Sequence, residues 1–234
     1  MAISIDTVYQ KVLTLANKEQ RGYITPQEFN IFADQVQLEI FEQYFYDLNQ
    51  IMRVQGNNEE YSDITHNINE KIAIFESVSD TTGTGSTRVI NAAVIGQMWR
   101  LGTVFNETTG TELEQVQQDE ILYLQKSSLI APSGMYPVYV RTLEDTISVF
   151  PTGMSGTFKC NYIRKPDKPS WGYVVINSRA MYDSANTVDF ELHPAEQNEV
   201  IYKILKLAGV SIKRDDLVKT GQGLESLQVQ QEKL

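Results

Sequence analysis

Residues 17–53, NKEQRGYITPQEFNIFADQVQLEIFEQYFYDLNQIMR, begin as a turn and continue as a pattern typical of one long helix. Thr25 can cap the helix N-terminus, and Pro26 suits the first helical position. Glu28 can then bond back to the Thr25 amide, which completes a capping box. We therefore predict a long helix that starts at Pro26 and extends to about Arg53, and the rest of the fold is organised around it.

This helix carries two apolar stripes, each with residues three or four positions apart, so that the members of a stripe share one face. The two faces are rotated by roughly a third of a turn or more, at 3.6 residues per turn. A surface helix buries one stripe, so a helix with two stripes needs two partners. Both a core position and a contact between subunits stay open. The stripes are Phe29, Ala33, Val36, Ile40 and Tyr44, and Leu38, Phe41, Phe45, Leu48 and Met52.

The composition is that of a globular protein, with 41% hydrophobic residues in a chain of 234. No apolar run approaches the ~20 residues of a membrane span. The first ten residues, MAISIDTVYQ, lack the basic and apolar regions of a signal peptide, so we expect a protein made and kept in the cytoplasm. The formal net charge of -10 argues against a protein that coats duplex DNA, but it suits a surface past which DNA slides.

The sequence offers little catalytic or metal-binding chemistry. Cys160 is the single cysteine, which excludes an internal disulfide and a cysteine-built metal site. His66 lies in a polar stretch and His193 precedes a proline, so we interpret both as surface or turn residues. Residues 17–28 have the spacing of a calcium-binding EF-hand loop, but Arg21 places a cation where an oxygen ligand is needed. We expect no catalytic residue, no metal and no cofactor.

The rest of the chain changes character twice. A short amphipathic helix is predicted from Asp6 to Ala16, and another helix from about Asp63. From Val78 to Glu191 the chain consists of short β-branched and aromatic segments bounded by Gly, Pro and Asn, which predicts strands. Helical signals return at His193. The strand candidates are residues 87–95, 98–106, 120–125, 136–143, 146–151, 156–166 and 171–176.

These segments predict an α+β fold. Both chain ends, residues 1–77 and 192–234, form a helical domain, and residues 78–191 form an inserted antiparallel β-rich domain that is sandwich-like or barrel-like. The polar stretch SVSDTTGTGS, residues 77–86, is interpreted as a linker. Its two glycines are not followed by Gly-Lys-Ser/Thr, which argues against a phosphate-binding loop.

Two regions are candidates for contact with another subunit or partner. The long helix has an aromatic patch, Phe41, Tyr44, Phe45 and Tyr46. It lies among acidic residues, so we favour packing in a core or between subunits over stacking on nucleic-acid bases. The last segment, from Asp215, has few apolar anchors to offset the entropy cost of ordering it, and Gly221 and Gly223 are predicted to interrupt any continuous helix there. The candidate interface residues are Phe41, Tyr44, Phe45, Leu48, Leu217, Leu224 and Leu227.

Three stretches of the chain together resemble a known family. They are YQKVLTLANKEQRGYITPQEFNIFADQVQLEIFEQYF at residues 9–45, YIRKPDKPSWGYVVI at 162–176 and FELHPAEQNEVIYKILKLAGVSI at 190–212. They are similar to neck proteins of tailed bacteriophages, notably the crAss-like phages of gut and aquatic bacteria. The resemblance carries no catalytic residue.

The resemblance implies a virion structural protein, a ring or head-to-tail adaptor that joins the portal to the tail and is assembled in the cytoplasm of the host bacterium. Such rings are homo-oligomers, commonly dodecamers. They contact the portal and other neck or tail proteins, and double-stranded DNA passes through their channel without tight binding.

A second class of function also stays open at this point. A β-rich protein could bind a small ligand or a carbohydrate, with Trp99, Trp171 and Tyr173 stacking on a sugar ring. That function predicts a monomer with exposed tryptophans, whereas a neck ring predicts an oligomer.

Overall fold

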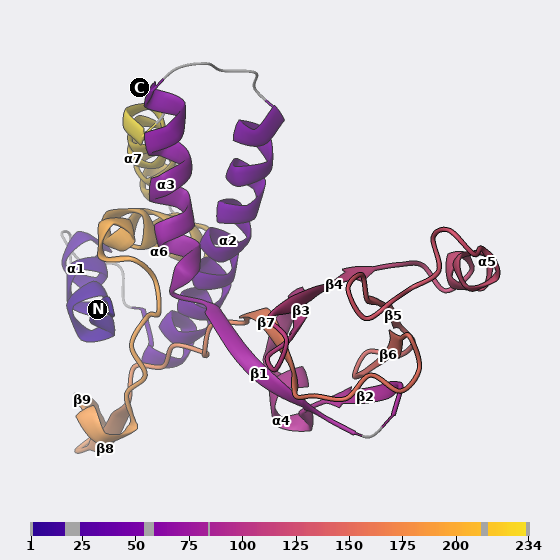
Figure 1. Cartoon of the computed structure of the whole chain (residues 1–234). Helices are drawn as coiled ribbons and strands as arrows, with labels where there is room; N and C mark the ends of the chain where they lie inside the picture. Colours follow the sequence, from indigo (N-terminus) through magenta and orange to yellow (C-terminus); the bar gives the residue numbers. More distant parts are fainter. Residues whose placement is uncertain (1, 17–23, 54–58, 84, 212–214, 233–234) are drawn as a thin grey trace. The chain divides into compact units, whose positions relative to one another are not determined.

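A computed structural model describes residues 2–16, 24–53, 59–83, 85–211 and 215–232. Its internal contacts divide the chain into two compact units (Figure 1). Residues 1–74 and 166–234 form the first, which we name the helical unit, and residues 75–165 form the second, the barrel unit. The predicted α+β fold, with a barrel-like β domain and helices at both chain ends, is confirmed.

The helical unit is built from helices of both chain ends and a small two-stranded sheet. Helix α6 packs against α1, α2 and α7, and α3 packs against α2. The elements are α1 (Ile5–Ala16), α2 (Pro26–Arg53), α3 (Glu59–Ala73), β8 (Tyr173–Ile176), β9 (Arg179–Tyr182), two short 3₁₀ turns η1 (Ser184–Asn186) and η2 (Pro194–Glu196), α6 (Gln197–Ser211) and α7 (Asp215–Glu232).

Helix α2 begins at Pro26, as predicted, with a capping box. The Glu28 amide donates to the Thr25 hydroxyl at 3.3 Å, and the Glu28 carboxylate accepts from the Thr25 amide at 2.9 Å. A further bond from the Thr25 hydroxyl lowers the pKa of Glu28, with help from the amide. The EF-hand-like spacing falls largely on residues 17–23, which lie outside the described residues.

The two stripes of α2 have different surroundings. All five members of the first stripe, Phe29 to Tyr44, are buried inside the unit. In the second stripe Phe41 is buried, three members are half-buried, and Met52 is exposed. The first stripe therefore finds its partner within the chain, while the second is covered only in part.

The barrel unit is a closed barrel with the strand order β1-β2-β6-β5-β4-β3-β7. The neighbouring pairs are antiparallel except β4 and β5, which are parallel, so the barrel is mixed and not fully antiparallel as predicted. Its elements are β1 (Glu76–Thr82), β2 (Thr87–Ile90), α4 (Ala92–Ile95), β3 (Met98–Asn106), β4 (Thr111–Gln115), α5 (Glu120–Lys126), β5 (Val138–Arg141), β6 (Thr146–Phe150) and β7 (Phe158–Arg164).

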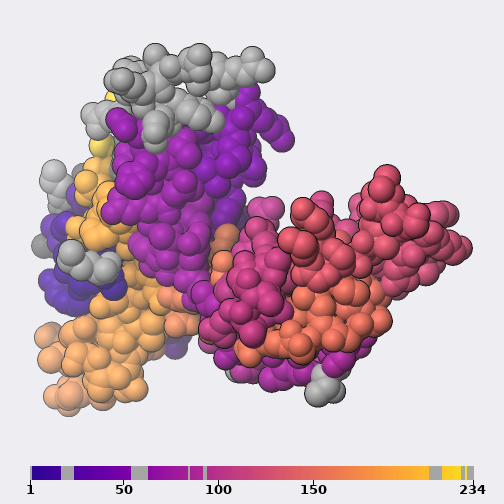
Figure 2. Space-filling view, in the orientation of Figure 1, coloured from indigo at the N-terminus to yellow at the C-terminus, as the bar shows by residue number. Residues whose placement is uncertain are grey.

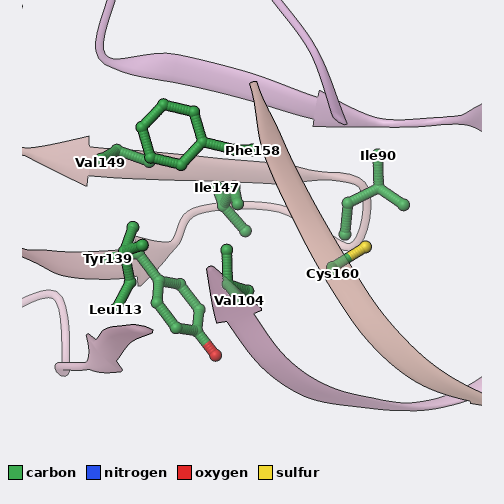
Figure 3. Close-up of a cluster of buried hydrophobic side chains, with 8 residues drawn as sticks. All are labelled: Ile90, Val104, Leu113, Tyr139, Ile147, Val149, Phe158 and Cys160. Atoms are coloured by element: carbon green, nitrogen blue, oxygen red, sulfur yellow. The ribbon is translucent and has the colours of Figure 1, made fainter. Parts of the chain in front are cut away.

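The barrel interior is apolar, and alternate residues face inward where a strand is regular. Strands β5 and β6 alternate in this way, with Tyr139, Ile147 and Val149 in the core (Figure 3). Cys160 is fully buried among them, and its burial raises the pKa of the thiol. The labelled core side chains are Ile90, Val104, Leu113, Tyr139, Ile147, Val149, Phe158 and Cys160.

Three local predictions were wrong. The stretch at residues 77–86, expected as a linker, is mostly strand β1, which pairs with both β2 and β7. Residues 120–125, expected as a strand, lie in helix α5; Glu, Leu, Gln and Lys are good helix formers, and only Ile121 of the helix is buried. Residues 92–95, expected to continue a strand, form the short helix α4.

The division between the units also differs from the predicted ranges. Residues 166–191, which we grouped with the β-rich domain, lie in the helical unit. Phe190 forms a β-bridge with Ile3, and the buried Gln37 donates to the Asp167 carbonyl at 2.7 Å and accepts from the Glu191 amide at 3.1 Å. These long-range contacts, from Ile3 ahead of α1 and from Gln37 of α2, hold the segment in the helical unit.

Helix α7 is continuous from Asp215 to Glu232, so the predicted interruption at Gly221 and Gly223 was wrong. Gly221 is buried against α6, and a Cβ added there would lie 3.2 Å from the Tyr202 carbonyl oxygen and the Lys206 Cβ. The missing side chain therefore allows the two helices to approach closely. Helix α6 likewise continues past Gly209 and ends at Ser211.

Candidate interaction surfaces

The four residues of α2 that we predicted at an interface differ in how deeply they are buried. Phe41 and Tyr44 are buried within the subunit, and Phe45 and Leu48 are half-buried. Phe45 meets Phe41 edge to face, with 5.1 Å between the ring centroids. Only the outer pair, Phe45 and Leu48, offers apolar surface to another molecule, and that contact stays a prediction.

The candidate interface residues of the last segment lie on α7. Leu224 is half-buried, Leu227 is 57% exposed, and the side chain of Leu217 lies outside the described part of the structure. Lys206 of α6 forms an ion pair with Glu225 at 3.0 Å, so α7 is held to its own chain by charge as well as by packing. Leu227 is the member that presents apolar surface.

The aromatic residues considered for sugar stacking do not form one platform. Trp171 is only 5% exposed, and its indole Nε1 donates to Asp6 at 3.0 Å. Its ring packs against Tyr9, with 4.4 Å between centroids, and against Tyr173 at 5.9 Å. Trp99 belongs to the barrel unit. The faces of Trp171 are therefore used inside the helical unit.

The helical unit also holds a buried charge cluster that the sequence did not predict. Glu196 and Glu199 are almost fully buried, and Lys71 of α3 forms an ion pair with Glu196. Lys203, also buried, lies 3.2 Å from the Glu199 carboxylate and 3.0 Å from that of Glu39 on α2. The cluster thus joins η2, α2, α3 and α6.

Within this cluster the pKa values of Glu199 and Lys203 are both raised above their usual values. Burial, followed by the hydrogen bond with Glu196, raises the pKa of Glu199 from 4.5 to about 7, although Lys203 opposes the shift. Burial acts to lower the pKa of Lys203, but Glu39 and Glu199 outweigh it and raise that pKa above its usual value. Three carboxyl groups face two ammonium groups, so a proton on Glu199 balances the charge of the cluster.

The most exposed apolar surface of the barrel unit lies on the connection between β4 and β5, residues 116–137, which we name the arm. It contains α5 and projects from the barrel (Figures 1 and 2). Its base is fixed, because Ile121 is buried against Val138 and Val140. The remaining large apolar side chains, Leu122, Tyr123, Leu129, Ile130, Met135 and Tyr136, are 59–92% exposed.

Sequence reasoning missed the arm. The available signal was apolar residues placed where turn residues dominate, such as Leu129 and Ile130 before Pro132, and Met135 and Tyr136 after Gly134. Loops that carry large apolar side chains without strand or helix periodicity are unusual unless something covers them.

The helical unit exposes a second apolar surface on the β8–β9 hairpin. Asn177 and Ser178 have φ values of 50° and 62°, which suits a two-residue hairpin turn with both residues in the left-handed region. The inner end of the hairpin is anchored by Tyr173 and Tyr182 on Trp171. The exposed side chains include Val174, Val175, Ile176 and Met181.

Comparison of the chain with protein-family models and with curated proteins finds no match. Within the described residues, no set of three His, Cys, Asp or Glu side chains is placed to hold a metal ion. Among the described helices, none combines the length and apolar character needed to cross a bilayer.

Proposed function

We propose that this protein is a structural component of a bacteriophage virion, a homo-oligomeric ring in the neck that connects the portal to the tail around the DNA channel. In this role it acts by assembly and not by catalysis. Its partners are further copies of itself, the portal protein, and other neck or tail proteins.

The observation that carries the proposal is the apolar surface that a single copy leaves in solvent. Both units contribute to it, the barrel unit through the arm and the helical unit through the β8–β9 hairpin. The largest apolar patch on a typical monomer is about 300–600 Å², and larger ones mark sites of association. A protein that exposes several large apolar side chains on each of its two units is suited to a permanent assembly.

The positions of the three resembling stretches in the structure support the resemblance to neck proteins. Residues 9–45, 162–176 and 190–212 are far apart in the chain, but they supply most of α1, α2, the Trp171 region and α6. These parts contact one another in the helical unit, as the packing of the Trp171 ring on Tyr9 and of α6 on α1 and α2 illustrates. The three stretches therefore describe one common core.

The charge supports the same role. A net charge of -10 disfavours binding to phosphates, and a channel must let the genome pass without retaining it. An acidic ring repels duplex DNA at short range, so the DNA is guided and not bound.

The test is to measure the mass of the purified protein, alone and mixed with the portal and tail proteins of the same virion, and to image any assembly by electron microscopy. We expect a closed ring of many copies, either alone or seated on the portal. A protein that stays monomeric at high concentration and does not associate with the portal or tail proteins would refute the proposal.

A further inference from the structure

The arm is a folded segment whose backbone is held by hydrogen bonds within the arm itself. The amides of Ser133 and Tyr136 each donate to the carbonyl of the other residue at 3.2 Å, and the Tyr136 amide also meets the Ser133 hydroxyl at 3.3 Å. This turn presents Met135 and Tyr136, while Ile121 fixes α5 to the barrel. The exposed side chains are thus held by a folded support.

The area of this surface matches what a specific contact needs. A large apolar or aromatic side chain carries roughly 150–250 Å². The six exposed side chains of the arm, at 59–92% exposure, therefore offer on the order of 700 Å². A stable protein–protein interface buries about 800 Å² on each partner, so the arm alone comes close to one side of an interface.

The exposed charges around the arm are mainly acidic. Glu112 and Glu114 of β4 and Asp119 and Glu120 at the start of α5 are exposed. The basic residues beside them are Lys126 and Arg141, and the Arg141 guanidinium donates to the Glu144 carbonyl at 3.0 Å. A partner surface that complements the arm is therefore apolar and basic.

The barrel unit carries a surface of that kind on another part of its wall. Met98 and Leu101 of β3 both pack against the barrel core, with a bulge between Met98 and Arg100. Because the bulge adds a residue between the two inward positions, Trp99 and Arg100 both lie on the outside. Trp99 is 45% exposed, and Arg100 is exposed.

Lys165, directly after β7, completes this surface, which we name the Trp99 patch and define as Trp99, Arg100 and Lys165. The Lys165 amide donates to the Gln97 carbonyl at 2.6 Å, which holds exposed Lys165 beside the start of β3. The neighbouring Arg164 is not part of the patch, because it pairs with the inward Met98 and its guanidinium lies over the buried Phe75 ring, 5.9 Å from the ring centroid.

We propose that the arm of one copy docks on the Trp99 patch of a second copy, so that successive barrel units join head to tail. The inference rests on the proposed ring and names the contact that builds it. Apolar arm side chains cover the Trp99 ring, and Asp119 and Glu120 meet the basic residues of the patch. A contact between two different patches on each copy generates a ring when its rotation closes.

The alternative arrangement, arm against arm, is disfavoured by charge. Two copies of the arm would bring Glu112, Glu114, Asp119 and Glu120 toward the same residues of the partner, and like charges placed together are repelled. Such a symmetric contact also satisfies itself within a dimer and leaves the Trp99 patch uncovered.

The first test exchanges the charges of the two surfaces. One variant carries Asp119→Lys and Glu120→Lys, and the other carries Arg100→Glu and Lys165→Glu. Each variant alone places like charges at every contact, so we expect a tenfold or greater rise in the concentration needed for assembly, with an unchanged circular dichroism spectrum. An equimolar mixture can alternate the two variants so that every contact pairs opposite charges, and we expect it to recover assembly.

The outcomes separate the inference from the proposed function. If wild-type protein forms rings and both variants do so equally well, the ring stands and this contact is overturned. If the variants self-assemble normally but the arm variant loses its binding to the portal, the arm docks on another virion protein and the inference fails. If wild-type protein neither self-assembles nor joins the portal, the proposed function itself fails.

A cross-linking experiment tests the same contact without relying on charge. Because Cys160 is fully buried, an introduced cysteine is the single accessible thiol. Protein with Leu129→Cys is mixed with protein carrying Gln97→Cys and oxidised, and we expect a covalent dimer of the two variants. The control pairs Leu129→Cys with Val175→Cys on the β8 hairpin, which is also exposed. Equal yields in the two mixtures would overturn the inference.

Discussion

The buried carboxyl pair in the helical unit predicts a loss of stability as the pH rises through neutrality. Glu199 hydrogen-bonds Glu196, and its pKa is raised from 4.5 to about 7, first by burial and then by that bond. Between these two pH values the folded protein holds a proton that the unfolded chain has released. The free energy of unfolding therefore falls as the pH rises across this window.

The magnitude follows from the size of the shift. Each pKa unit corresponds to about 1.4 kcal/mol, so a shift from 4.5 to about 7 is worth about 3 kcal/mol. This stabilisation is fully present below pH 4.5 and is lost once the pH has passed the folded-state value near 7. It is a large part of the 5–15 kcal/mol that is typical of a folded domain.

The assay must report on the helical unit alone, because two units need not unfold together. The two tryptophans permit this, since Trp171 lies in the helical unit and Trp99 in the barrel unit. In a Trp99→Phe background the fluorescence of Trp171 follows the helical unit. Urea unfolding between about pH 5 and pH 8 then gives the free energy of unfolding against pH.

Glu199→Gln removes the titration and keeps a neutral side chain that can donate to Glu196. We expect this variant to lose most of the decline between pH 5 and pH 8. Glu42→Gln, which changes an exposed carboxylate on α2, should leave the decline intact and serves as the control. A wild-type free energy of unfolding that is flat or rises over this range would refute the raised pKa of Glu199.

Three further predictions concern the helices and the charge. Thr25→Ala should lower the free energy of unfolding by about 1 kcal/mol through loss of the cap. Phe41→Ala removes a fully buried ring and should lower it by about 3–5 kcal/mol. Both are measured by urea denaturation, and equal effects would mean that α2 is peripheral. Half-buried Phe45→Ala should cost less than Phe41→Ala. Gly221→Ala should destabilise the packing of α7 on α6 and lower the midpoint of thermal unfolding, whereas Gly223→Ala, with open space around it, should not. Binding of duplex DNA, measured by fluorescence anisotropy at physiological salt, should be near background, and nanomolar affinity with a steep salt dependence would contradict a passive channel.

Several predictions that depended on local chemistry succeeded, although the strands expected at residues 92–95 and 120–125 are helices. The start of α2 could be predicted because Thr25, Pro26 and Glu28 interact within one turn, and their bonds are as expected. The buried stripe from Phe29 to Tyr44 followed from helical periodicity alone. The α+β class with a barrel inserted between helical ends was also predictable, because the change from helical to strand periodicity is clear in the sequence.

Predictions that depended on distant partners failed or fell short. Residues 77–86 resemble a linker, and only their pairing with β2 and β7 makes them a strand. Gly221 looked like a helix breaker because the close approach of α6, which explains the glycine, lies in another part of the chain. The bonds from Gln37 that bring residues 166–191 into the helical unit likewise join positions more than a hundred residues apart.

The candidate surfaces were likewise only partly predictable from the sequence. Phe45 and Leu48 of the second stripe are half-buried and their role at an interface stays a prediction, whereas Phe41 and Tyr44 proved to be core residues. The arm was missed, since a loop has no period from which exposure can be inferred. The paired carboxyls Glu196 and Glu199 are three positions apart, but their burial depends on α2 and α3, which no local pattern reveals.

The parallel pairing of β4 with β5 has a consequence for how this chain can vary. Two parallel neighbours require the chain to travel back along the barrel before it enters the second strand, and such a return takes a dozen or more residues. The barrel thus demands a minimum length at residues 116–137 but places few demands on the amino acids there beyond the anchor at Ile121. Closure of the barrel would therefore tolerate many sequences in this segment, and only the contact with a neighbouring copy restricts its exposed residues, whereas shortening it to a tight turn would break the closure.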